Sequence, residues 1–117
     1  MRFAPMVALC LTACTGPAVT DAELCRDVIR RLCAAPRCAE VDAAFGVGDT
    51  CEATLLTRSG CAAETFSFAT PDRNRVLSCR LPLIRQGDRL DAHPACIDVL
   101  ETLDRCPDLT KALGGIQ

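Results

Sequence analysis

The 117-residue chain carries 13 Lys and Arg residues against 15 Asp and Glu residues, which gives a formal net charge of −2 at pH 7. This length suffices for one domain and is short for two. Mild acidity and the absence of Trp and Tyr argue against nucleic-acid binding, which needs a basic excess and usually stacking aromatic side chains. A core with so few aromatic rings must be built from aliphatic side chains and half-cystines.

Segment 1–13 has the features of an export signal. It begins with one basic residue, Arg2, and continues as an apolar run from Phe3 to Ala13. About 20 apolar residues are needed to cross a bilayer as a helix, and this run is much shorter. We therefore predict a cleaved leader rather than a transmembrane helix.

The residues that end this run, Leu11-Thr12-Ala13-Cys14, resemble the lipobox of bacterial lipoproteins. The resemblance implies that segment 1–13 is a signal peptide. It also implies that Cys14 is lipidated and begins a tether spanning 14–22. It also implies anchoring in the bacterial cell envelope, and the lack of Asp after Cys14 favours the outer membrane. Cleavage after Ala18 as an ordinary secretory signal is the alternative.

Cysteine usage agrees with export. Of the ten cysteines, Cys10 belongs to the leader and Cys14 to the lipobox. The other eight form an even set, which in an exported domain predicts a disulfide framework: Cys25, Cys33, Cys38, Cys51, Cys61, Cys79, Cys96 and Cys106.

The spacings of Cys33 to Cys38 and of His93 to Cys96 would suit zinc, but exported thiols oxidise. We expect no metal and no cofactor.

The first predicted helix spans 24–33. Leucine, valine, isoleucine and cysteine side chains recur there at helical spacing, and arginine and aspartate side chains fall on the opposite face. Thr20 or Asp21 is the expected N-cap, and Pro36 prevents the helix from continuing.

In the middle of the chain, the sequence pattern predicts two short helices and a connector. Residues 39–45 form the first helix, which the glycine-rich residues 46–48 end. Residues 51–58 form the second helix, which ends at Gly60. The polar and apolar residues of 64–68 alternate as in a strand, but no pairing partner follows, so this segment is predicted to be an extended connector.

Two further helices complete the chain. One starts at Thr70-Pro71-Asp72, and Pro82 is expected to end or kink it, because proline lacks an N–H and clashes with the preceding turn. The other spans 96–106, with Pro94 near its start and Pro107 beyond its end. The prediction is an all-α fold, a small disulfide-rich bundle of about four short helices over 23–113, with a tail at 114–117.

Helix geometry limits which cysteines can pair. At 1.5 Å per residue, Cys25 and Cys33 lie about 12 Å apart along one helix, whereas the Cα atoms of a disulfide rarely exceed about 7 Å. If the helices at 24–33 and 51–58 are antiparallel, the natural pairs are Cys25 with Cys61 and Cys33 with Cys51. Eight cysteines allow 105 connectivities, and the sequence does not choose among the others.

Charged residues concentrate in the last two helical regions. They form either opposed patches for an envelope protein or anionic lipid head groups, or two solvated faces joined by weak surface ion pairs. We prefer the second interpretation. The basic set is Arg73, Arg75, Arg80, Arg85 and Arg89, and the acidic set is Asp98, Glu101, Asp104 and Asp108.

Three functions are compatible with these features. We favour a membrane-anchored lipoprotein whose helical domain has a binding or structural role, with an envelope protein as the possible partner. The eight cysteines and four helices also resemble plant non-specific lipid-transfer proteins, which implies a carrier of a small apolar ligand or lipid, although their adjacent Cys-Cys and Cys-x-Cys signatures are missing. A hydrolytic enzyme that uses His93 as a general base, oriented by Asp91, has no nucleophile motif to support it. We therefore expect no catalytic activity.

Overall fold

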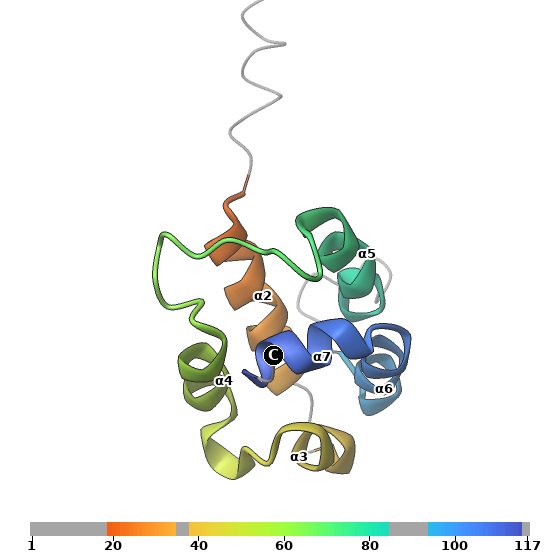
Figure 1. The fold of residues 1–117 in the computed structure, drawn as a ribbon. Coiled ribbons are helices and arrows are strands. Elements are labelled where there is room, and N and C mark those ends of the chain that lie inside the picture. Colours follow the sequence, from red (N-terminus) through yellow and green to blue (C-terminus); the bar gives the residue numbers. More distant parts are fainter. Residues whose placement is uncertain (1–18, 35–37, 85–93, 116–117) are drawn as a thin grey trace, which may run out of the picture.

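The computed structural model describes residues 19–34, 38–84 and 94–115. These residues form helices and connecting turns without a strand, which confirms the predicted all-α, disulfide-rich bundle (Figure 1). In chain order the elements are α2 (Asp21–Ala34), α3 (Ala39–Phe45), the 3-10 turn η1 (Gly48–Thr50), α4 (Cys51–Ser59), α5 (Arg73–Ile84), α6 (Cys96–Arg105) and α7 (Pro107–Leu113).

Several predicted features lie outside the described residues. They are the leader at 1–13, the lipidation residue Cys14, the helix stop at Pro36, the basic residues Arg85 and Arg89, and the candidate catalytic pair Asp91 and His93.

Helix α2 is the element on which α4 and α5 pack from opposite sides, as Figure 1 shows. It begins at Asp21, so the last two residues of the predicted tether are helical. The Thr20 hydroxyl accepts the N–H of Glu23 at 3.1 Å, which confirms Thr20 as the N-cap. Its inward face is fully apolar and is formed by Ala22, Leu24, Cys25, Val28, Ile29 and Leu32.

Glycines end the two short helices where the sequence predicts. Gly46 follows α3 with φ of 64°, and Gly60 follows α4 with φ of 82°. In this left-handed conformation the Gly46 N–H donates to the Asp42 carbonyl and the Gly60 N–H donates to the Leu56 carbonyl. Between Gly60 and α5 the chain is extended or turned, which confirms the predicted connector.

The structure refines what the sequence predicts for two prolines. Helix α5 continues past the buried Pro82 to Ile84. Since Pro82 lies in the last turn, its missing N–H removes a single helical hydrogen bond close to the point where the helix ends anyway. Pro107 does more than follow α6, because it occupies the first turn of a further short helix, α7, where a missing N–H costs nothing.

The four disulfides connect segments that are distant in the sequence. Cys25 pairs with Cys61 and Cys33 with Cys51, which confirms both predicted pairs and the antiparallel arrangement of α2 and α4. The other two bridges join Cys38 with Cys96 and Cys79 with Cys106. The Cα–Cα distances of the four pairs are 6.0, 5.7, 5.5 and 6.1 Å, all in the ordinary range.

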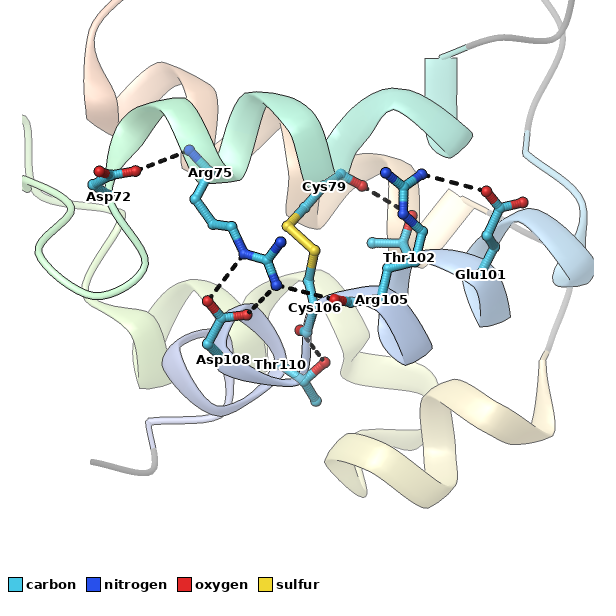
Figure 2. The surroundings of a disulfide bond; sticks show 9 residues. All are labelled: Asp72, Arg75, Cys79, Glu101, Thr102, Arg105, Cys106, Asp108 and Thr110. Atoms are coloured by element: carbon cyan, nitrogen blue, oxygen red, sulfur yellow. Dashed lines mark hydrogen bonds and ion pairs between the residues drawn. A yellow bond between two sulfur atoms is a disulfide. The ribbon is translucent and has the colours of Figure 1, made fainter.

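A buried hydrogen bond reinforces the contact between α5 and α6. Thr102 is only 1% exposed and is the buried polar residue of the described core. Its hydroxyl donates to the Cys79 carbonyl at 3.1 Å, next to the disulfide between Cys79 and Cys106 (Figure 2). Without this hydrogen bond, burial of the Thr102 hydroxyl would cost free energy.

We expect Thr102→Val to lower the free energy of unfolding by about 1 kcal/mol, because the buried hydrogen bond to Cys79 is lost. Urea unfolding of the oxidised protein measures this change. Thr57→Val is the matched control, since the Thr57 hydroxyl bonds to the Ala53 carbonyl of its own helix at the surface. The account of this contact fails if both variants unfold at the same urea concentration as the wild type.

Candidate binding groove

An open groove of about 640 Å³ lies between the connector, which we define as residues 60–72, and helix α7. In Figure 1 the connector passes the start of α2 on its way from α4 to α5. The lining is mostly apolar and is formed by Cys25, Ser59, Phe66, Ser67, Phe68, Ala69, Thr70, Pro107, Asp108, Lys111, Ala112 and Leu113. A concave, mostly apolar site with a few polar groups is the usual form of a small-molecule site.

Asp21, the first residue of α2, fixes the far part of the connector. Its carboxylate accepts the Phe68 N–H at 2.9 Å and the Ser67 hydroxyl at 3.4 Å. The same carboxylate forms an ion pair of 2.7 Å with Arg73 at the start of α5. The Phe68 N–H and the Arg73 guanidinium lower the pKa of Asp21 below its ordinary value of 3.8, because both favour the charged form.

One turn further along α2, two neighbouring residues hold the near part of the connector. Cys25 forms its disulfide with Cys61. The guanidinium of Arg26 donates to the Cys61 carbonyl at 3.3 Å and pairs with Glu64 at 3.0 Å. The connector is therefore attached to α2 at both ends, although it has no regular secondary structure.

Two phenylalanines give this connector its apolar wall. The rings of Phe66 and Phe68 meet edge to face, with centroids 4.9 Å apart and planes at 87°. Both rings are half-buried, pack against the core and line the groove. Residues two apart in an extended segment point to the same side, which explains why the alternation predicted for 64–68 brings these rings together.

Helix α7 forms the opposite wall. Leu109 and Leu113 are buried against the core, at 2% and 1% exposed. Because residues three and four apart share a helix face, Asp108, Lys111 and Ala112 fall together on another face, and all three line the groove. This wall therefore carries the charged groups of the groove.

Arg75 of α5 neutralises one of these charges. Its Nε and Nη2 atoms donate to the two carboxylate oxygens of Asp108 at 3.2 and 3.3 Å, and Nη2 also donates to the Arg105 carbonyl at 3.0 Å (Figure 2). This two-point contact lowers the pKa of Asp108 below its ordinary value of 3.8. Arg75 and Asp108 together add no net charge to the groove.

Lys111 is the other charged residue in the described part of the lining. Its side chain is exposed, and within the described residues it has no ion-pair partner. The groove thus combines an apolar aromatic wall with one positive charge that its own neighbours do not neutralise.

The arginines of α5 only partly follow the predicted pairing with the acidic residues of the last helices. Arg75 does so through Asp108. Arg73 and Arg80 instead pair with Asp21 and Asp27 of α2, at 2.7 and 2.9 Å. Burial raises the pKa of Asp27, but its hydrogen bonds to arginine side chains outweigh that effect and hold the pKa below 3.8. These pairs position α5 on α2.

All eight cysteines of the predicted set are in disulfides. Cys33, Cys38 and Cys96, whose spacings would suit zinc, therefore have no free thiolate. Across the described ranges, no cluster of three or more His, Cys, Asp or Glu side chains could hold a metal ion. In the same ranges no helix has the length and hydropathy for a membrane crossing.

Comparisons with protein families, curated proteins and solved structures found no match to this chain.

Sequence reasoning missed the groove because it missed α7. The signal was present: Pro107 in the first turn, Asp108 beside it, Lys111 in the last turn and Gly114 after the end are the usual features of a short helix. That the connector lies opposite this helix depends on tertiary contacts, such as those of Asp21, which no local pattern reveals.

We expect Asp21→Asn to loosen the connector, because the neutral side chain has a single acceptor oxygen, which can take the Phe68 N–H but cannot also form an ion pair with Arg73. The Phe68 amide should exchange with solvent roughly tenfold faster near neutral pH. Hydrogen exchange followed by NMR measures this, and Glu23→Gln on the exposed face of α2 is the control.

The wild type should lose the same protection on acidification. Since the folded-state pKa of Asp21 lies below 3.8, its contribution is complete above pH 3.8 and disappears as the pH falls through the folded-state value. A Phe68 amide whose protection, corrected for intrinsic exchange, is equal in wild type and Asp21→Asn would contradict this assignment.

Proposed function

We propose that this chain is a lipoprotein of the bacterial cell envelope, anchored through Cys14 in the outer membrane, whose helical domain binds a partner or ligand near the membrane surface. The observation that carries the proposal is the pairing of all eight cysteines that follow Cys14. Four structural disulfides are typical of an oxidising compartment outside the cytosol.

The distribution of the cysteines also supports an anchor. Cys10 and Cys14 are the two cysteines outside the disulfide set; Cys10 lies in the segment that resembles a lipoprotein leader, and Cys14 is the last residue of the lipobox. Helix α2 begins at Asp21, only a few residues after Cys14. An extended chain spans at most about 3.3–3.6 Å per residue, so the anchored domain would lie within about 25 Å of the lipid.

The groove favours a second candidate function, the carrying or sensing of a small apolar or amphipathic ligand. A tightly packed bundle without a cavity would have excluded it. A groove of about 640 Å³ with a mostly apolar lining is within the usual range for ligand sites. Binding and anchoring are compatible, because the lining comes from residues 59–113 apart from Cys25, which is held in its disulfide with Cys61.

We expect the protein extracted from native membranes to have the mass of residues 14–117 plus acyl groups, with no thiol alkylated unless the protein is first reduced. Intact mass spectrometry after alkylation measures both properties. Cys14→Ser is the control and should remain unprocessed or unacylated while keeping four bridges. An unacylated wild-type mass, or alkylated thiols without reduction, would overturn the proposal.

A further inference from the structure

We propose that the groove binds one long-chain fatty acid, with the alkyl chain along Phe66 and Phe68 and the carboxylate at Lys111. This inference rests on the proposed function in that it names the ligand of the anchored binding domain. The geometry that carries it, however, belongs to the connector and α7 and is independent of the lipid on Cys14.

The size and lining of the groove suit an alkyl chain. Its volume of about 640 Å³ is that of a small-molecule site, too small for a protein domain. Phe66, Phe68 and Ala69 provide one apolar wall, and Pro107 and Ala112 extend the apolar surface across the groove. Burial of an alkyl chain there is favourable because it removes apolar surface from water.

The charge of the groove selects the head group. The Asp108 carboxylate already accepts two hydrogen bonds from Arg75, so among the described lining residues Lys111 carries the one uncompensated charge. A monovalent carboxylate neutralises this charge. An alkylammonium ion would instead be repelled by Lys111 and would have to compete with Arg75 for Asp108.

The connector is held in a way that keeps the groove open for a ligand. The Asp21 carboxylate accepts the Phe68 N–H, and a disulfide joins Cys25 to Cys61. The aromatic wall is therefore attached to α2 rather than to α7. Helix α7 is attached separately, through the disulfide between Cys79 and Cys106 at its start. Each wall is therefore held by a covalent bridge of its own, and little ordering is needed on binding.

Photocrosslinking of the full chain in isolated membranes tests this proposal. The probe is a palmitic acid with a diazirine in mid-chain and a terminal alkyne, which isolated membranes cannot attach metabolically to Cys14. After reduction, trypsin releases the connector as peptide 59–73, because cleavage follows Arg58 and Arg73. We expect a saturable adduct on this peptide that unlabelled palmitate competes away and hexadecyltrimethylammonium does not.

Substitutions at the charged wall separate the groove from general lipid contact. We expect Lys111→Glu to reduce the adduct at least tenfold and Lys111→Arg to retain it. Arg30→Glu makes the same change of charge at a residue that is 66% exposed and outside the lining, and should label like the wild type. The non-reduced mass of each variant shows whether its four bridges have formed.

Three results would overturn the proposal: an adduct that Lys111→Glu leaves unchanged, competition by the alkylammonium ion equal to that by palmitate, or labelling confined to residues before α2, which would place the probe at the membrane anchor. These results are distinct from failure of the proposed anchoring, which the intact mass reports whether or not the groove is labelled.

Discussion

The arrangement of the described helices depends on the four disulfides, because each helix begins, ends or is crossed at a half-cystine. The bridges form two covalently linked groups. One joins α2, α4 and the connector, and the other joins α3, α5, α6 and α7. A disulfide typically contributes about 2–4 kcal/mol, which matters in a core whose side chains are mainly aliphatic and contain few rings.

Besides the backbone that runs between them, noncovalent contacts hold the two groups together. Arg73 and Arg80 of α5 pair with Asp21 and Asp27 of α2, and the two helices pack against each other. Asp21 serves a second purpose, since it also accepts the Phe68 N–H. The contact that positions α5 on α2 therefore also positions the aromatic wall of the groove, which links the stability of the fold to the geometry of the candidate site.

Local sequence patterns predicted the helices well and the groove poorly, for physical reasons. The Thr20 cap, the glycine ends at Gly46 and Gly60 and the pairing of Cys25 with Cys61 follow from rules that act over a few residues or along one helix. The groove follows from no such rule, because Phe68 and Lys111 come from segments 43 residues apart that are brought together only by tertiary packing. Pro107 marks the end of one helix in the local pattern, but proline is equally suited to begin a helix, as it does in α7.

The central claim, that the disulfide framework determines how these segments meet, is tested most directly by mapping the bridges. Proteolysis of the non-reduced protein at mildly acidic pH, followed by tandem mass spectrometry, identifies each linked peptide pair. Our account predicts four links, Cys25 to Cys61, Cys33 to Cys51, Cys38 to Cys96 and Cys79 to Cys106. Free thiols at any of these residues, or a link between the two covalent groups such as Cys61 to Cys106, would contradict it.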